Sequence, residues 1–279
     1  MNFDSIIAQV NSLPPLSDAA VFVQRLYAEG AENVDIIKLV KIIESDALLA
    51  VNILKMINAP FYGFSKKIAS VPQAVSLFGT NTVYGLVMNY ALQERIKANV
   101  SAYGVSSAQF NDICHLQSAL MMQWYSKIDL RHSQFLVPLA LMMESGKLIL
   151  AKVIHDSAAT QEFKDGLVHC DNIEDYEQEF FGTTSYSVCA LLFEHWNLEP
   201  LYVEILEGLD SENDNINNQM QTYINSLNVI RIAVNVKDFL TEESIQKACT
   251  EVEDMGLDTE YFKHVALRIK NSYLEKLNK

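Results

Sequence analysis

The sequence has few of the features that mark nucleic-acid-binding, membrane or metal-ribbon proteins. Only 21 of its 279 residues are Lys or Arg, against 35 Asp or Glu, so the formal net charge is -14. A chain with so few clustered cations is not expected to bind nucleic acid or an anionic membrane surface. Its most apolar window, 137–143, is far shorter than the roughly 18 residues of a membrane span.

Cysteine is also scarce. The 4 cysteines lie far apart and form no Cys-x-x-Cys pair, so neither a zinc ribbon nor a thioredoxin-type motif is expected. Small buried thiols in a reducing compartment are the simpler interpretation. The N-terminus lacks the basic and apolar stretches of a signal peptide, and the cytoplasm is therefore the expected location.

The motifs of common active sites are missing. The 10 glycines are scattered, which excludes a phosphate-binding loop and a dinucleotide fingerprint. No histidine has a second ligand at His-x-x-x-His or Glu-x-x-His spacing. The only His-Asp doublet, His155-Asp156, falls at a predicted helix end, where a histidine facing the helix dipole explains it. Ser145-Gly146-Lys147 lacks the upstream glycines of a P-loop.

Apolar residues recur at helical spacing along nearly the whole chain, and strand alternation is absent. After a helix that ends before Pro14 and one between Ser17 and Gly30, helices are predicted over 35–44, 46–57, 70–79, 80–96, 107–128, 133–144, 146–155, 160–169, 172–181, 184–197, 199–208, 219–237, 242–255 and 258–277. The small, polar stretch 97–106 is the best linker candidate. It predicts an N-terminal helical lobe, 1–97, and a second lobe, 107–279. Residues 210–218 are acidic and Asn-rich, which is typical of an exposed loop.

Six short motifs occur in a fixed order. They are Leu13-Pro14-Pro15-Leu16, Glu44 to Leu49 with Ala47 where proline is usual, Ile57 to Gly63, Ser70 to Gly79, Ser145 to Leu150, and Leu191 to Leu198. Together they resemble the HD-related output domain (HDOD) family over residues 12–208. The resemblance implies an all-α, two-lobed fold in which an HD-like helical half follows an N-terminal lobe.

The HDOD family is related to the HD phosphohydrolases, whose metal site uses one His, a His-Asp doublet and further His or Asp ligands. The positions that the resemblance aligns with this set are His115, Met143, Glu144, Ser185 and Gly208. One imidazole and one carboxylate remain, whereas a catalytic metal needs about three good protein ligands. Since Met143 is a poor ligand for hard cations, no catalytic residue, metal or cofactor is expected. Glu144 and His115 are expected to form a buried hydrogen-bonded pair.

The resemblance implies a non-catalytic, regulatory module of bacterial signal transduction, linked to motility or chemotaxis, that contacts protein partners of its pathway. One alternative is a metal-dependent HD-type phosphohydrolase or phosphodiesterase whose ligands lie elsewhere. Another is a small-ligand sensor that uses the degenerate pocket lined by the aligned positions.

Two further questions stay open at the level of sequence. Phe61 and Tyr62 either bury in the interface between the lobes or form an interaction surface, and burial is favoured because large aromatics usually bury most of their area. The C-terminal segment 219–277 carries two apolar stripes and is expected to pack against the HD-like half. The other reading is a homodimer through the last helix.

Overall fold

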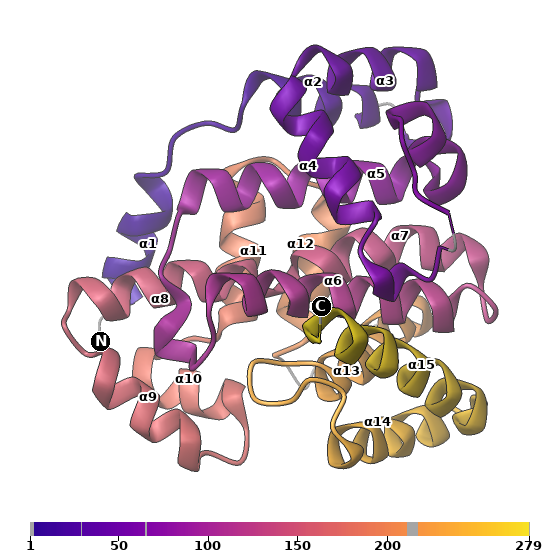
Figure 1. Ribbon diagram of the computed structural model, residues 1–279. Helices are drawn as coiled ribbons and strands as arrows, with labels where there is room; N and C mark the ends of the chain where they lie inside the picture. The colour runs from indigo at the N-terminus through magenta and orange to yellow at the C-terminus, as the bar shows by residue number, and fades with distance from the viewer. Residues whose placement is uncertain (1–2, 29, 65, 211–216, 279) are drawn as a thin grey trace. The chain divides into compact units, whose positions relative to one another are not determined.

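The computed structural model describes residues 3–28, 30–64, 66–210 and 217–278. Within these ranges the chain is helical, and the one β-type contact is an isolated bridge between Val234 and Phe239 (Figure 1). The helices are α1 (Phe3–Asn11), α2 (Asp18–Tyr27), η1 (Ala31–Asn33), α3 (Ile36–Ser45), α4 (Ala47–Ile57), η2 (Pro60–Tyr62), α5 (Val71–Ile96), η3 (Val100–Tyr103), α6 (Ser107–Tyr125), α7 (Leu130–Met142), η4 (Met143–Ser145), α8 (Gly146–Asp156), α9 (Thr160–His169), α10 (Ile173–Phe181), α11 (Ser185–His195), α12 (Pro200–Gly208), α13 (Asn218–Ala233), α14 (Glu242–Asp254) and α15 (Thr259–Leu277). The predicted all-α class is confirmed. None of the described helices combines the length and the apolar character that a bilayer crossing requires.

Short polar side chains start many of these helices as the sequence predicts. The side chains of Ser17, Asp46 and Thr184 each accept a hydrogen bond from the backbone N–H three residues on. Each such cap is worth about 1 kcal/mol. Gly79, with a φ of 78°, interrupts the helical backbone inside α5 where the sequence predicts one helix to end and the next to begin.

The chain divides into two compact units, each assembled from three stretches. The first unit comprises 1–15, 92–114 and 143–228, and the second comprises 16–91, 115–142 and 229–279. The predicted boundary at 97–106 is therefore not the one that the structure has. The reason is that η3 lies in this stretch and buries Val100, Ala102 and Tyr103, although its composition resembles that of a linker.

In the first unit, Gly146 allows α8 to approach α11 more closely than any other residue would. A Cβ at this position would lie 1.8 Å from the carbonyl oxygen of Ser185 and 2.8 Å from the backbone nitrogen of Cys189. The N-terminal segment joins the same unit, where the indole of Trp196 donates to the carbonyl of Pro14 at 3.1 Å. The glycine of the Ser-Gly-Lys motif thus serves helix packing and not phosphate binding.

In the second unit, the turn at η2 is covered by the C-terminal helix α15. Phe61 and Tyr62 are 1% and 3% exposed, so the suggestion that they form an interaction surface is wrong and the alternative of burial is confirmed. Lys276 on α15 lies over the Phe61 ring, 5.6 Å from its centroid. Gln123 donates to the Phe61 carbonyl at 2.6 Å and accepts from Arg268 at 2.7 Å.

Both C-terminal stripes are buried within the chain. The buried members are Tyr223, Leu227, Ile230, Val234, Phe262, Val265, Ile269 and Tyr273. Part of the predicted packing needs correction, because α15 packs not only on Trp124 of the expected HD-like half but also on the N-terminal turn η2. Since α15 uses its stripe inside the chain, this stripe is not available for a dimer. The acidic loop predicted at 210–218 lies largely outside the described residues.

Candidate functional site

The candidate site forms around one buried lysine in the first unit. The segment Met143–Ser145 is a single 3-10 turn, and α8 follows it directly. The spacing of three residues brings the carboxylate of Glu144 to 2.8 Å from the ammonium of Lys147. The side chains of Glu144 and Lys147 are 0% and 1% exposed, so this ion pair has no contact with water.

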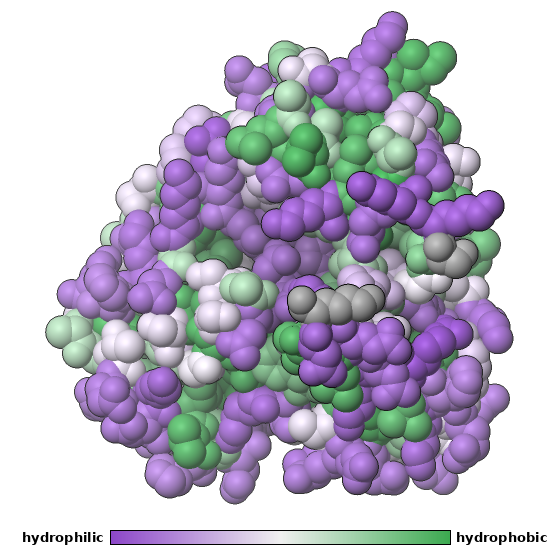
Figure 2. Space-filling view, in the orientation of Figure 1, coloured by the Kyte–Doolittle hydropathy of each residue, from purple (hydrophilic) through white to green (hydrophobic). Residues whose placement is uncertain are grey.

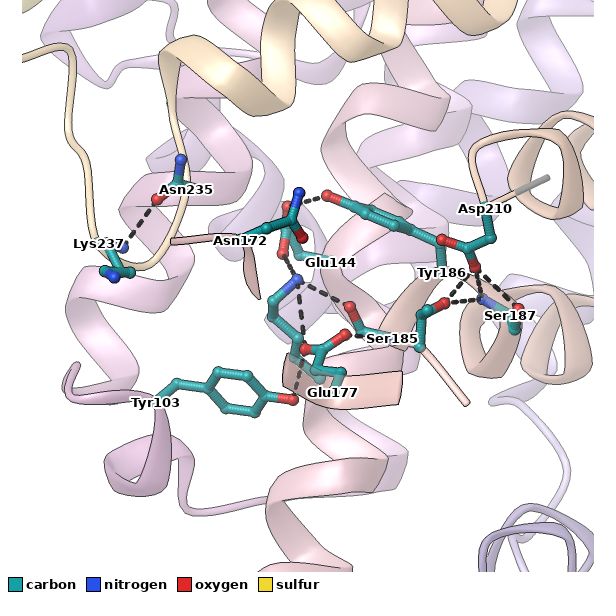
Figure 3. Close-up of polar contacts among 12 residues, drawn as sticks. Tyr103, Glu144, Asn172, Glu177, Ser185, Tyr186, Ser187, Asp210, Asn235 and Lys237 are labelled. Atoms are coloured by element: carbon teal, nitrogen blue, oxygen red, sulfur yellow. Dashed lines mark hydrogen bonds and ion pairs between the residues drawn. The ribbon is translucent and has the colours of Figure 1, made fainter. Parts of the chain in front are cut away.

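The other partners of Lys147 come from helices α10 and α11. Its ammonium donates to the Ser185 hydroxyl at 2.8 Å and lies 3.8 Å from a carboxylate oxygen of Glu177. Figure 3 shows Glu144, Glu177 and Ser185 converging on one point from different segments of the chain. The buried cation is thus held by one side chain from the turn just before it and by two from helices more than 25 residues further along the chain.

Glu177 is itself held in place by two donors. It accepts from the Tyr103 hydroxyl at 2.8 Å through one carboxylate oxygen and from the backbone N–H of Ser185 at 2.6 Å through the other. The second bond places a carboxylate at the N-terminus of α11, where the helix dipole favours negative charge. Asp210 adds a second carboxylate there, because it accepts from the backbone N–H of Ser187 at 3.1 Å.

Two tyrosine rings enclose the lysine. Its ammonium lies 4.9 Å from the centroid of Tyr186 and 5.9 Å from that of Tyr103. The Tyr186 hydroxyl also donates to Glu144 at 3.2 Å. A cation over an aromatic face is attracted by the ring's negative quadrupole, and this attraction strengthens where water is excluded. The tyrosines therefore contribute to holding a charge that would otherwise be costly to bury.

The electrostatics of the cluster keep the lysine charged. Burial by itself disfavours the ammonium, but the carboxylates of Glu144 and Glu177 outweigh it and hold the pKa of Lys147 well above its usual value. Burial raises the pKa of Glu177, against the opposing effect of Lys147. Burial, reinforced by the Glu177 carboxylate, raises the pKa of the Tyr103 hydroxyl. A protonated Lys147 between two acidic side chains is the state that these shifts favour.

His115 belongs to the second unit and has a different partner from the one expected. Its Nδ1 shares a hydrogen bond of 2.9 Å with the Tyr62 hydroxyl, and Nε2 has no hydrogen-bond partner among the described residues. Glu144 pairs instead with Lys147 and Tyr186, so the expected His115–Glu144 pair is wrong. Burial, with a smaller effect of Lys276, lowers the pKa of His115 to about 3, which keeps the imidazole neutral.

The positions aligned with the HD metal ligands thus have different surroundings in the structure. Glu144 and Ser185 share the lysine, and Met143 is buried beside Glu144 in the chain. Gly208 ends α12 and offers no side chain. Among the residues that the structure describes, no group of three His, Cys, Asp or Glu side chains could hold a metal ion.

Sequence reasoning missed Lys147, Glu177, Tyr103 and Tyr186. Lys147 did carry a signal, because it precedes the run Leu148-Ile149-Leu150 at the start of a buried helix. A lysine at such a place must find an acidic partner. Glu177 gave no comparable signal, since it is one of several acids in 174–179.

The all-α fold, with a buried lysine held by Glu144 and Ser185, two of the positions that the resemblance aligns with HD metal ligands, is consistent with an HD-related domain. The sequence agrees, because the model of the HDOD domain matches residues 13–209. The chain belongs to the HDOD family. A comparison with curated proteins found no match.

Solved structures with the same fold extend over the C-terminal helices as well. An HDOD domain protein of unknown function from Geobacter sulfurreducens is 12% identical, with 98% of this chain and 96% of that chain covered and a TM-score of 0.65. A candidate signal transduction protein from Marinobacter aquaeolei VT8 is 19% identical, with 98% and 63% covered and a TM-score of 0.67. A candidate phosphohydrolase from Shewanella amazonensis SB2B is 13% identical, with 96% and 97% covered and a TM-score of 0.68. At these identities the likeness concerns the fold.

Proposed function

We propose that this protein is a non-catalytic module of bacterial signal transduction that works through contacts with protein partners. The observation that carries the proposal is the buried Lys147 ammonium, which lies 2.8 Å from Glu144 and 2.8 Å from Ser185, two of the positions aligned with HD metal ligands. A cation of the protein itself therefore holds the carboxylate that a divalent metal would need.

The chemistry of hydrolysis does not fit this arrangement. HD-type hydrolysis needs a metal that lowers the pKa of a bound water, and such a metal needs about three good ligands and an open coordination position. Glu144 is fully buried and its negative charge is already balanced by Lys147. A divalent ion would have to displace a hydrogen-bonded ammonium and would then meet a hydroxyl at Ser185 in place of an imidazole.

The signalling part of the proposal draws on the family and its relatives. The family is named for output domains, and one protein of similar fold is described as a candidate signal transduction protein. Motility or chemotaxis is the pathway in which we would look first for a phenotype. The partner is expected to be a protein, since the net charge of -14 opposes binding to nucleic acid.

Metal content and hydrolysis together test the non-catalytic assignment. The purified chain would be measured for Mn, Fe, Zn and Mg, and then assayed with cyclic dinucleotides and bis-p-nitrophenyl phosphate with each metal added. We expect no stoichiometric metal and no turnover above that of the buffer. Metal-dependent turnover that His115→Ala abolishes and that the exposed control His264→Ala leaves intact would refute the proposal in favour of an HD-type phosphodiesterase.

A further inference from the structure

Helices α2, α3 and α4 of the second unit expose large apolar side chains to solvent. Phe22 is 51% exposed, Ile37 68% and Val51 63%. Leu48, one turn before Val51, is 62% exposed. These helices pack consecutively, α2 on α3 and α3 on α4, and Figure 2 shows hydrophobic side chains on the surface over them. Large exposed apolar patches are rare on monomers and mark interaction sites.

A basic side chain lies one turn after an exposed apolar residue on each of these helices. The Arg25 guanidinium lies over the Phe22 ring at 5.9 Å. Lys41 follows Ile37 by four residues, and Lys55 follows Val51 by four. Since residues three or four apart lie on the same helix face, Phe22, Ile37 and Val51 each have a cation on their own face, one turn away.

Most of the acidic side chains of α2–α4 stand at helix starts. Asp35 and Asp46 are N-caps, accepting from the backbone N–H of Lys38 and Leu49 at 3.0 Å each. Asp18 is in the first turn of α2, which leaves Glu44 as the one carboxylate in the body of these helices. The surface formed by Phe22, Ile37, Leu48 and Val51 is therefore apolar with a basic border. We call it the α2–α4 surface.

This border contrasts with the rest of the chain. Residues 16–91 contain 6 basic and 6 acidic residues, whereas residues 143–228 contain 3 basic and 16 acidic residues. In a chain of net charge -14, the region that carries α2–α4 is therefore locally neutral. Complementary charge guides encounter and excludes wrong partners, so the partner must carry carboxylates beside its own apolar residues.

We infer that the α2–α4 surface is the docking site for an amphipathic segment of another protein whose apolar side chains are flanked by Asp or Glu. The inference rests on the proposed function, since it names the kind of partner that the module contacts. In the complex, the partner's apolar side chains cover Ile37, Leu48 and Val51. Its carboxylates meet Arg25, Lys41 and Lys55.

Two other occupants fit the observations less well. Anionic membranes recruit surfaces with clusters of about 4–8 cations, and here three border cations stand in a strongly acidic chain. A second copy could offer its own acidic residues from 143–228. That contact would join unlike surfaces head to tail, an arrangement that forms open chains unless the rotation closes a ring.

Site-directed photocrosslinking in the native cell tests the inference. A photoreactive amino acid replaces Val51 in the full chain, and the matched control carries it at Val168, which is 66% exposed on α9. Crosslinked segments are sequenced by mass spectrometry. We expect adducts at Val51 and not at Val168, on a segment that combines an apolar stripe with net negative charge.

A second experiment reverses the charge of two lysines at the border of the α2–α4 surface. Lys41→Glu with Lys55→Glu should lower the yield of the Val51 adduct at least tenfold, because it turns attraction into repulsion. The control pair Lys164→Glu with Lys263→Glu reverses two exposed lysines elsewhere and should change the yield less than twofold. All four positions are exposed, so the variants should fold.

Several outcomes would overturn the inference. These are adducts to a second copy of this chain, to lipid or to a basic segment, a yield at Val51 no higher than at Val168, and insensitivity to the reversal at Lys41 and Lys55. None of them bears on metal binding or hydrolysis. Conversely, metal-dependent turnover would refute the non-catalytic assignment while leaving the crosslinking result to stand on its own.

Discussion

At the scale of the residue, Lys147 shows how a fully buried charge is tolerated. Its ammonium lies 2.8 Å from both Glu144 and Ser185 and sits over the Tyr186 ring. These contacts replace most of the hydration that the ammonium loses on burial. Burying a pair of charges is costly, and removing one partner leaves the other uncompensated. The lysine is therefore a structural necessity for as long as Glu144 and Glu177 are present.

Replacing Lys147 tests whether the buried carboxylates depend on its charge. Lys147→Met should lower the free energy of unfolding by about 3–5 kcal/mol, because it leaves buried carboxylates without their counter-charge. Denaturant unfolding followed by circular dichroism measures the loss. Lys147→Met with Glu144→Gln should recover part of it. Lys152→Met, at a half-buried position of the same helix, is the control, and an equal loss there would contradict the argument.

A second prediction concerns the stability of the protein at acidic pH and rests on His115. Its pKa in the folded protein is about 3, below the ordinary value of 6.5, so protonation favours the unfolded chain. The stability that neutral His115 preserves is complete above about pH 6.5 and is lost as the pH falls toward 3, at about 1.4 kcal/mol per pH unit. Between pH 7.5 and 5 the wild type should lose about 2 kcal/mol more than His115→Gln.

The measurement for His115 is unfolding by urea at each pH. The exposed His264 provides the matched substitution, and His264→Gln should follow the wild type. If His115→Gln loses stability with the same pH dependence as the wild type, the imidazole is not the group that titrates.

At the scale of the element, the crossing of α8 and α11 sets the geometry of the cluster. Gly146 brings the two helices together, and the next residue, Lys147, then reaches Ser185 on the facing helix. The resemblance to a P-loop has no phosphate-binding meaning here. The close approach of the two helix backbones is enough to explain why a glycine stands at this position.

Gly146→Ala should therefore be strongly destabilising. Its Cβ would lie 1.8 Å from the Ser185 carbonyl oxygen, so the two helices must separate. Overpacking typically lowers the free energy of unfolding by about 1–3 kcal/mol, and we expect a loss at or above the upper end of that range. The control is Gly104→Ala, where nothing lies within 4 Å of the new Cβ and only the positive φ opposes the change, at about 1–2 kcal/mol. Thermal unfolding of both variants gives the comparison, and a smaller cost for Gly146→Ala would contradict the packing argument.

At the scale of the whole molecule, the helices beyond the matched family region complete the second unit. The family model ends at residue 209, yet α15 covers the η2 turn and sets Lys276 over Phe61. The hydroxyl of Tyr261 on α15 donates to the Gln123 carbonyl at 2.7 Å. The buried turn thus depends on a segment that follows it by about 200 positions in the sequence.

Truncation after Lys237 should consequently destabilise the chain without changing its oligomeric state. It removes α14 and α15, including the large buried side chains of Phe262, Val265, Ile269 and Tyr273, each worth about 1.5–3 kcal/mol when fully buried, and it exposes Phe61. Denaturation measures the loss, and light scattering measures the mass. An equally stable, folded product would show that the segment is an appendage. A change from dimer to folded monomer would show that it is an interface.

The sequence by itself determined the helices and their caps. Apolar spacing, N-caps such as Asp46 and the break at Gly79 act within a few residues, so they can be read from neighbours in the chain. The family followed from short motifs whose order and spacing are also local. The prediction that Phe61 buries rested on the size of the ring.

Only the tertiary structure decided which residues meet. Lys147 faces Glu177 and Tyr186, 30 and 39 positions further along the chain, and Glu177 meets Tyr103 from 74 positions before it. Helical periodicity shows which face of a helix is buried but not which helix covers it. The pairing of His115 with Tyr62 and the assembly of each unit from three separate stretches could therefore not be foreseen. The contacts around Lys147 depend on close approaches such as the one at Gly146, where helices distant in sequence pack backbone against backbone.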